Sequence, residues 1–318
     1  MKPVGGYFSL ELPHYEEYHK DALRLNTGRN CLEYILRVRK YRKVYIPYYT
    51  CDVVLEPFQK LGILYEYYHI NIHLELQQDI QLREGEALLY TNYYGLKQRY
   101  TEILACRYGS QLIIDNTQAF YARALAGIDT FYTCRKFFGV PDGAYLYTTG
   151  VLDAELEQDI SYDRMIFLTK RIDLSAEAGY GDFHEQSKRL VGQSIKRMSN
   201  LTERMMQSIR YGEIASRRKD NFNLLHSVLG NTNQLPIVCD DDAVPMVYPY
   251  FHDNKGIRDV LINNKVFVAR YWPNVLQWAK SDTLEYLLAA QMLPLPIDQR
   301  YDTNDMEIIL DILQKAER

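Results

Sequence analysis

The sequence predicts an α/β fold in which a mostly parallel sheet is covered by helices on both faces. Short runs rich in apolar, β-branched and aromatic residues, which are typical of strands, alternate with longer segments of helical periodicity. Strands that are separated by helices pair in parallel, and a parallel sheet is usually buried on both faces. The length of 318 residues further predicts one large domain with a smaller domain attached.

The predicted strands of the sheet lie in the first half of the chain. They cover residues 43–47, 63–70, 87–94, 111–117, 130–133 and 144–149. Helices are expected between several of these strands, at residues 31–40, 52–62 and 97–109. The second of these helices is predicted to end at Gly62, because glycine is the residue most often found just after the last helical turn.

The second half of the chain is predicted to begin with helices and to end in a small domain. Residues 184–230 contain few helix breakers, so we expect one or two long helices there. The predicted large domain therefore spans residues 1–230, and the predicted small domain spans residues 231–318. The small domain is expected to be an α+β unit with two strands and two helices, at residues 246–251, 265–272, 282–291 and 304–316.

Composition excludes several classes of protein. The net charge is −4 and the one basic run, residues 37–43, is short, so no nucleic-acid surface is expected. The five cysteines are odd in number and form no C-x-x-C pair, which argues against a disulfide framework and a thiolate zinc site. No apolar stretch is long enough to span a membrane, and acidic residues stand where a signal peptide needs its apolar centre. We therefore expect a soluble cytoplasmic protein without a membrane partner.

Two groups of residues could suggest a metal site, but each has a simpler explanation. His69 and His73 are four residues apart in a segment that alternates as a strand, so they would not share the helical face that zinc ligands use. The acidic run at residues 240–242 lies in a stretch rich in helix and strand breakers, where a solvated turn is expected. No metal is therefore predicted.

Candidate ligand-binding residues stand where the predicted parallel strands end, because ligands of open parallel sheets bind at that edge. Thr27, Gly28 and Arg29 precede a helix whose first N–H groups and positive dipole end favour a phosphate. Asp115 ends a predicted strand, and Lys136 follows the next strand along the chain. Taken singly, each has a simpler explanation: a capped helix start for the first group and for Asp115, and a surface charge for Lys136.

Taken together, these positions resemble the aspartate-aminotransferase superfamily of pyridoxal-phosphate enzymes. More closely, they are similar to the DegT/DnrJ/EryC1/StrS family of sugar aminotransferases. Four segments carry the resemblance: "TGR" at 27–29, "PYYTCD" at 47–52, "DNTQA" at 115–119 and "KFFGVPDGA" at 136–144. Several features depart from the family pattern: Arg29 replaces a small hydroxyl residue, the interval between Asp115 and Lys136 and the whole chain are short, and "PDGA" at 141–144 stands for the second glycine pair.

The resemblance implies a fold type I pyridoxal 5'-phosphate enzyme and assigns roles to its residues. Lys136 would bond to the cofactor aldehyde and then move a proton during the reaction. Asp115 would face the pyridine nitrogen and keep it protonated. Gln118 would lie against the cofactor ring, and Tyr49, or alternatively Tyr48, would stack on it.

The resemblance also implies where the cofactor phosphate and the partner subunit lie. The turn at residues 27–29 would bind the phosphate together with Thr133, although Thr130 competes with Thr133 for this role. Enzymes of the family are typically homodimers with shared active sites, and Asn200 is the residue carried over as the contribution of one subunit to the site of the other.

The expected activity is transfer of an amino group from an amino acid, glutamate in the first instance, to a nucleotide-linked keto sugar. Arg270 is the first candidate to bind the carboxylate of a substrate, and Arg300 is the second. Tyr94 belongs to one of several tyrosine-rich loops that suit a sugar or a base. The alternatives are a non-catalytic dimeric binding protein of the same fold, or another pyridoxal-phosphate enzyme such as a lyase, a dehydratase or an amino-acid aminotransferase.

Overall fold

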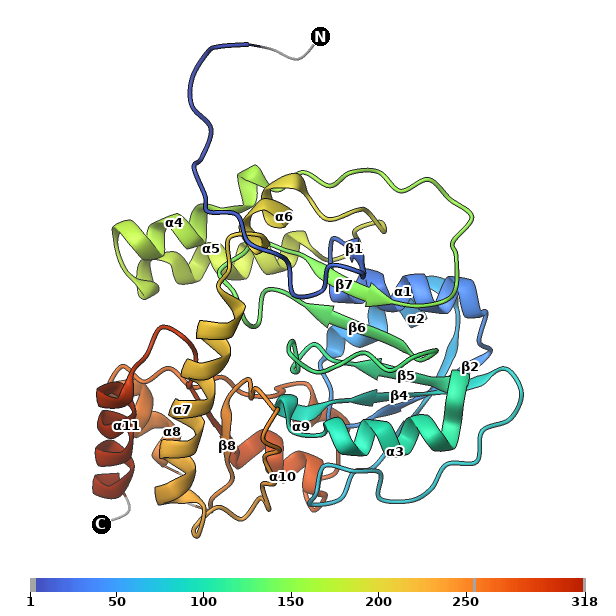
Figure 1. Ribbon diagram of the computed structural model, residues 1–318. Helices are drawn as coiled ribbons and strands as arrows, with labels where there is room; N and C mark the ends of the chain where they lie inside the picture. Colours follow the sequence, from blue (N-terminus) through green and yellow to red (C-terminus); the bar gives the residue numbers. More distant parts are fainter. Residues whose placement is uncertain (1–3, 254–255, 317–318) are drawn as a thin grey trace.

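A seven-stranded sheet forms the centre of the protein (Figure 1). The structure, a computed structural model, describes residues 4–253 and 256–316. Among these residues the strands of the large sheet are ordered β1-β7-β6-β5-β4-β2-β3. Their bounds are β1 (Leu23–Leu25), β2 (Lys43–Pro47), β3 (Leu64–Tyr68), β4 (Glu86–Thr91), β5 (Leu112–Asp115), β6 (Asp129–Thr133) and β7 (Ala144–Tyr147).

The sheet is mostly parallel, as the sequence predicts. Strand β2 pairs in parallel with β3 and β4, and the parallel pairing continues from β4 to β5 and from β5 to β6. Strand β7 runs antiparallel to both β6 and β1. Strand β1 was not predicted, because three residues are too few to show the alternation by which a strand is identified.

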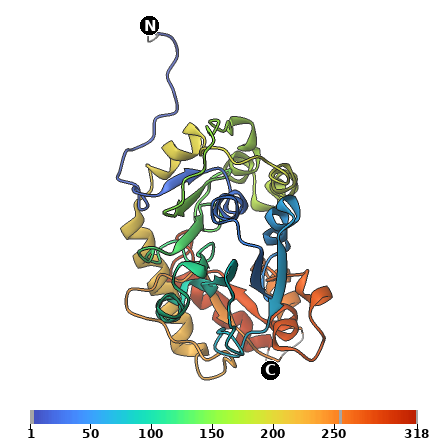
Figure 2. The ribbon, with the colours of Figure 1, turned by 90° about the vertical axis from the view of Figure 1, so that its right-hand side faces the viewer.

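Helices cover both faces of the large sheet, because successive side chains of each strand point to opposite faces. In β4, Ala87 and Leu89 pack in one apolar core, whereas Leu88 and Tyr90 pack in another. Figure 2 shows α1 and α2 on one side of the sheet and α3 on the other. These helices are α1 (Gly28–Arg39), α2 (Leu55–Leu61) and α3 (Gln98–Tyr108).

The prediction of one or two long helices over residues 184–230 is confirmed only in part, because one 19-residue helix lies there but an extended segment interrupts the helical stretch before it. Gly192 has a φ of 71°, and the chain after it runs along the end of β1. There the Asn26 N–H donates to the carbonyl of Lys196, and the Met198 N–H donates to the carbonyl of Arg24. The helices of this region are α4 (Ile166–Asp173), α5 (Ala176–Arg189), α6 (Asn200–Met206) and α7 (Tyr211–Leu229).

Among the described residues, the C-terminal part contains a small antiparallel sheet and four helices. The sheet pairs β8 (Tyr248–Tyr250) with β9 (Leu293–Leu295). The helices are α8 (Ile257–Asn263), α9 (Val275–Trp278), α10 (Leu284–Gln291) and α11 (Thr303–Ala316), so the two helices predicted here are confirmed. The strand predicted at residues 265–272 is wrong, because the carbonyls of Val268 and Ala269 accept hydrogen bonds from the Arg258 side chain rather than from a neighbouring strand.

Apolar packing joins the two halves of the chain. One core contains Tyr90 of the large sheet together with Ala289 of α10, and another joins Phe222 of α7 to Leu295 of β9 and Ile309 of α11. The carboxyl ends of β4, β5 and β6 therefore face the C-terminal part (Figure 1). The domain boundary at residue 230 stays a prediction. None of the described helices is both long and apolar enough to cross a membrane.

Candidate active site

The site begins where β5 and β6 end. Because these strands are parallel neighbours, the chain leaves both at the same edge of the sheet. Helix α1 starts at this edge as well: a Cβ atom on Gly28 would lie 3.4 Å from Cγ2 of Thr117 and 3.9 Å from Cβ of Thr133. The fold thus brings together three segments that the sequence placed at one strand edge.

Lys136 lies in the loop between β6 and β7, with its amine beside the end of β5. Its Nζ atom donates a 3.0 Å hydrogen bond to Oγ1 of Thr117. The side chain is open to solvent, although protein surrounds it closely enough that desolvation lowers the pKa of the amine. Asp115 and Cys51 raise the pKa again. A lysine with a lowered pKa is more often unprotonated, and so more often able to act as a nucleophile or a base.

Asp115 is buried at the carboxyl end of β5, with 4% of its surface exposed. Its Oδ1 atom accepts a 2.8 Å hydrogen bond from the Thr117 N–H. Burial raises the pKa of Asp115, whereas the charge of Lys136 and hydrogen bonds from Thr117 lower it. The carboxylate is thereby held near Lys136. Among the described residues, the two side chains form no direct ion pair.

Thr117 is the contact between these two charged residues, and the sequence analysis did not select it. It accepts from Lys136 and donates to Asp115, so it fixes their relative positions. The sequence did contain a signal for this role, because Thr117 stands two residues after an aspartate that ends a strand. In an Asx turn, the N–H at that position donates to the aspartate carboxylate.

The residues predicted to bind a phosphate lie at the start of α1. Thr27 caps this helix, because its Oγ1 atom accepts a 3.2 Å hydrogen bond from the Asn30 N–H. Thr133 lies beside Gly28, and its hydroxyl makes a long contact of 3.5 Å to the carbonyl of Gly143. Thr130 is fully buried and donates to the carbonyl of Ile128. Of the two competing threonines, the structure therefore places Thr133 beside the turn.

The side chain of Arg29 is bound elsewhere. Its Nη1 atom forms an ion pair with Glu56 of α2, and Glu56 also accepts a 2.8 Å hydrogen bond from the Gly192 N–H. Arg29 can therefore contribute its backbone N–H to the turn while its charge is neutralised by α2.

Gln118, Tyr94 and Tyr49 form a connected group on the other side of Asp115. Oε1 of Gln118 accepts a 3.0 Å hydrogen bond from the Tyr94 N–H, and the Tyr94 hydroxyl lies 2.8 Å from that of Tyr49. Tyr94 has a φ of 58°, which is uncommon for a residue other than glycine. All three side chains are buried. Among the described residues, Nε2 of Gln118 has no hydrogen-bond partner.

The two tyrosines proposed to stack on a ring have different surroundings. Tyr49 packs edge-on against Trp272, with 5.0 Å between the ring centroids. Tyr48 stacks on His69 and on Tyr67, each at 4.6 Å between centroids. Both choices for the stacking residue stay predictions.

The other predicted site residues make no hydrogen bond to Lys136 among the described residues. Nη1 of Arg270 donates to the carbonyls of Ala289 and Ala290 at the end of α10. Arg300 forms an ion pair with Asp298. Asn200 is the exposed first residue of α6. The roles expected of Arg270 in substrate binding and of Asn200 at a subunit interface stay predictions.

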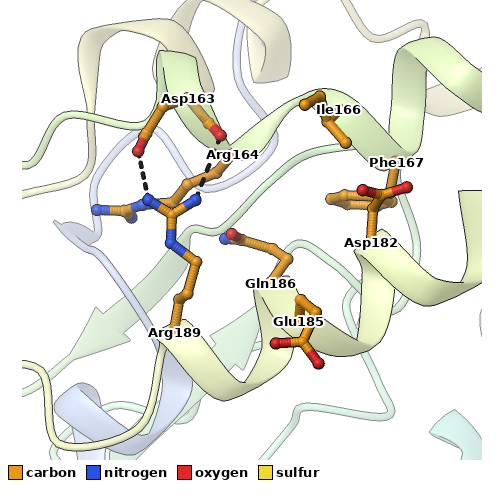
Figure 3. A pocket seen from close by; sticks show the side chains of 8 residues that line it. All are labelled: Asp163, Arg164, Ile166, Phe167, Asp182, Glu185, Gln186 and Arg189. Atoms are coloured by element: carbon orange, nitrogen blue, oxygen red, sulfur yellow. Dashed lines mark hydrogen bonds and ion pairs between the residues drawn. The ribbon is translucent and has the colours of Figure 1, made fainter.

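Two cavities lie apart from this group of residues. One, of about 110 Å³, is lined by residues of α4 and α5 and by the turn before them, where Arg189 pairs with Asp163 (Figure 3). The other, of about 230 Å³, lies between Lys97, Tyr100 and Pro236. Neither cavity is lined by any residue that the sequence analysis selected for the cofactor.

The residues at the strand edge fit a pyridoxal phosphate molecule. Lys136 provides an accessible amine, Asp115 provides a buried carboxylate near it, and the start of α1 provides N–H groups that have no acceptor within the helix. The absence of a Cβ on Gly28 leaves room between Thr117 and Thr133. The buried Nε2 of Gln118 is a hydrogen-bond donor that a polar ring substituent would satisfy.

The comparisons with known proteins agree on the fold. No protein-family model and no curated protein matches this sequence. Solved structures do match it. One is a DegT DnrJ EryC1 StrS aminotransferase from Brucella abortus, with a TM-score of 0.60 and 12% identity, covering 92% of this chain and 85% of that chain. Another is the sugar aminotransferase CalS13 from Micromonospora echinospora, with a TM-score of 0.61 and 13% identity over 93% and 87% of the two chains.

A third match is ntda from Bacillus subtilis, whose structure contains bound cofactor PMP; its TM-score is 0.62 and its identity 14%, over 93% of this chain and 73% of that chain. The chain has the fold of these aminotransferases. The prediction of a mostly parallel sheet of the pyridoxal-phosphate transferase type is thereby confirmed.

Proposed function

We propose that this protein is a pyridoxal-phosphate-dependent aminotransferase of the DegT/DnrJ/EryC1/StrS family. Its reaction would transfer an amino group from an amino acid, such as glutamate, to a nucleotide-linked keto sugar. The observation that carries the proposal is the position of Lys136, whose amine lies at the carboxyl edge of the sheet, linked through Thr117 to the buried Asp115. The fold shared with sugar aminotransferases supports it.

Each residue of the site has a task in this reaction. When bound, the cofactor supplies an aldehyde that bonds to an amine and a ring that accepts electrons from the substrate. Lys136, with its lowered pKa, would provide the amine and would then carry a proton between two carbon atoms. Asp115 would hold a positively charged ring nitrogen, because a buried carboxylate is stabilised by a cation.

The phosphate and the ring would be held by neutral groups. The first N–H groups of α1 and the hydroxyl of Thr133 would bind the phosphate, with Gly28 allowing close approach. The amide of Gln118 would donate to a polar group on the ring, since its Nε2 atom has no partner among the described residues. Tyr94, which Gln118 holds, would face the substrate.

A homodimer would complete the site. Helix α4 buries none of its residues; Ile172 in its last turn is 84% exposed, and Leu174, directly after the helix, is 68% exposed. Exposed apolar side chains on a helix that packs mainly against α5 suit an interface between two copies. Asn200 would reach the cofactor site of the other copy. Sedimentation showing a monomer at micromolar concentration would contradict this part of the proposal.

The first experiment asks whether Lys136 binds the cofactor. Pyridoxal phosphate is added to the purified protein, the bond is reduced with borohydride, and the labelled peptide is identified by mass spectrometry. We expect the label on Lys136. Lys97, which is paired with Glu75, serves as a control for nonspecific labelling. A label confined to other lysines, or no label, would contradict the proposal.

The second experiment tests the acceptor. The protein carrying the aminated cofactor is mixed with a nucleotide-linked keto sugar, with pyruvate or with oxaloacetate, and the return of the original absorbance is followed. We expect the sugar to react far faster than either acid. Full-rate reaction with a small 2-keto acid alone would instead identify an amino-acid aminotransferase.

A further inference from the structure

A buried arginine on α7 contacts the loop that carries Lys136. Arg218, on α7, is 1% exposed, and its guanidinium makes its hydrogen bonds to carbonyl groups. Nη1 donates to Met246 at 2.9 Å and to Pro245 at 3.4 Å, and Nη2 donates to Phe137 at 3.4 Å. One side chain thus joins α7, the segment before β8 and the residue directly after Lys136.

A second side chain reaches the same carbonyl from another segment. Nε2 of Gln299, which follows β9, donates to the carbonyl of Phe137 at 2.7 Å. The guanidinium of Arg218 also lies over the ring of Phe137, 4.7 Å from its centroid. On the other side, the Phe137 N–H donates to the carbonyl of Cys134 at 3.0 Å. The residue after Lys136 is therefore held through its N–H, its carbonyl and its ring.

The charge of Arg218 is poorly compensated for a buried ion. The carboxylate of Asp298 is an electrostatic neighbour, but it forms hydrogen bonds with Arg300. Burial lowers the pKa of Arg218 to about 10. Among the described residues, Nε of Arg218 and Oε1 of Gln299 have no hydrogen-bond partner. A buried charge without an ionic hydrogen bond is unfavourable for stability, so stability alone does not explain why an arginine stands here.

We propose that Arg218 and Gln299 are positioning residues, which fix the backbone after Lys136 and thereby direct its amine toward Thr117 and Asp115. Two donors on one carbonyl set the orientation of that peptide group more strictly than one donor can. Arg218 lies on α7, which packs with β9 and α11, and Gln299 follows β9. The position of the reactive lysine therefore depends on how these elements pack against the large sheet. The inference rests on the proposed function only in taking Lys136 as the reacting lysine.

The test measures the amine of Lys136 directly and needs no cofactor. Cofactor-free protein is treated with formaldehyde and cyanoborohydride over a range of pH, and methylation of Lys136 is quantified by mass spectrometry. The titratable groups that face this amine are Asp115 and Cys51. In the wild type, desolvation holds the pKa of Lys136 below that of an ordinary lysine.

The decisive variant is Arg218→Met. Without the guanidinium the loop loosens, the protein atoms around Lys136 pack less closely, and the pKa of its amine rises, so methylation at pH 8 should fall by about three- to tenfold. Gln299→Leu should shift the profile in the same direction by a smaller amount. The shift in the double variant should be smaller than the sum of the two single-variant shifts, because both side chains act on one carbonyl.

A matched control comes from an arginine of the C-terminal part, on α8. Arg258 also donates to carbonyls, those of Val268, Ala269 and Met292, and burial lowers its pKa to about 10 as well. It makes no hydrogen bond to the loop of Lys136 among the described residues. Arg258→Met should therefore leave the methylation profile of Lys136 unchanged.

Two outcomes would overturn the inference. One is a folded Arg218→Met or Gln299→Leu variant with the methylation profile of the wild type. The other is an equal shift in Arg258→Met, which would show a general loosening of the C-terminal part. If Arg218→Met does not fold, Gln299→Leu alone decides the matter. Failure of the proposed function would be seen separately, as an absence of borohydride-fixed cofactor on a Lys136 whose methylation responds as expected.

Discussion

The two ends of the loop between β6 and β7 differ in how their buried charges are compensated. At the far end, Asp142 accepts hydrogen bonds from the Thr202 hydroxyl and from Arg164. Arg164 is also held by both oxygens of Asp159, at 2.7 and 2.9 Å. At the near end, Lys136 and Asp115 are linked through Thr117 and form no ion pair with each other among the described residues. Burial raises the pKa of Asp142 as well as that of Asp115, so the two ends differ in their hydrogen-bond partners and not in burial.

This difference shows how the loop can hold the unfavourable charges of Lys136 and Asp115 at its near end. The far end closes a network in which each charge has a partner, and the Gly143 N–H adds a 2.7 Å hydrogen bond to the carbonyl of Asn26. A rigid attachment of this kind can retain a reactive lysine and a buried carboxylate that would otherwise move apart. The far end should therefore serve stability, and the near end should serve chemistry. Four substitutions test this division.

The largest effect is expected from Lys136→Met. Turnover should fall by about 10²–10⁴-fold, the range for loss of a positioned proton-transfer group. The free energy of unfolding at pH 7 should rise, because the lowered pKa shows that the folded state disfavours the protonated amine. This gain should vanish as the pH rises above 10.5, where the amine is neutral in the unfolded chain as well. Turnover assays measure the first effect, and urea unfolding at pH 7 and above pH 10.5 measures the second. A loss of stability at pH 7 would contradict the view that the near end of the loop serves chemistry and not stability.

The second effect concerns Asp115→Asn, which keeps an oxygen for the Thr117 N–H but removes the charge. Turnover should fall by about 10- to 100-fold, matching about 1.5–3 kcal/mol for a hydrogen bond to a charged group. The pKa of Asp115 is raised above 3.8 in the folded protein, so its ionisation reduces stability as the pH rises through the folded pKa. The variant should therefore gain stability relative to the wild type above pH 3.8 and match it below. Near-normal turnover would show that Asp115 only caps the turn.

The third effect belongs to the far end. Asp142→Ala should lower the free energy of unfolding by about 1–3 kcal/mol, because the Thr202 hydroxyl and one Arg164 nitrogen lose their acceptor. The loss should stay in this range because Asp159 still binds Arg164. Thermal and urea unfolding measure the loss. Turnover per folded molecule should stay close to that of the wild type. A selective loss of turnover would contradict the assignment of stability to the far end and chemistry to the near end.

The smallest effect is expected from Gly28→Ala at the start of α1. The added Cβ would make ordinary contacts, 3.4 Å to Thr117 and 3.9 Å to Thr133, so the fold should tolerate it. It would occupy the space next to the helix N–H groups, so affinity for pyridoxal phosphate should fall by a few-fold. Titration with pyridoxal phosphate measures this.

A matched control for that substitution is Gly181→Ala in α5, where no atom lies within 4 Å of the added Cβ. It should raise helix stability by about 0.5–1 kcal/mol and leave the affinity unchanged. If the wild type and Gly28→Ala bind pyridoxal phosphate with equal affinity, the start of α1 does not bind the phosphate.

Much of the site could be predicted from local sequence. Strands that alternate with helices must pair in parallel, and parallel strands place their carboxyl ends at one edge of the sheet. That rule, together with the family resemblance, predicted that Asp115, Lys136 and the turn at Thr27 lie near one another, and the structure brings them together. These features depend on periodicity and strand order, both of which can be read along the chain.

Other features depend on contacts between distant segments. The predicted long helix is interrupted because residues 193–198 pair with the end of β1, more than 160 residues earlier. Arg29 faces Glu56 rather than a ligand, and Arg218 and Gln299 meet at the carbonyl of Phe137. The sequence by itself thus determined the sheet and the edge that carries the reactive groups. Only the tertiary structure decided which side chains hold those groups, because hydrogen bonds between distant segments leave no local periodicity to recognise.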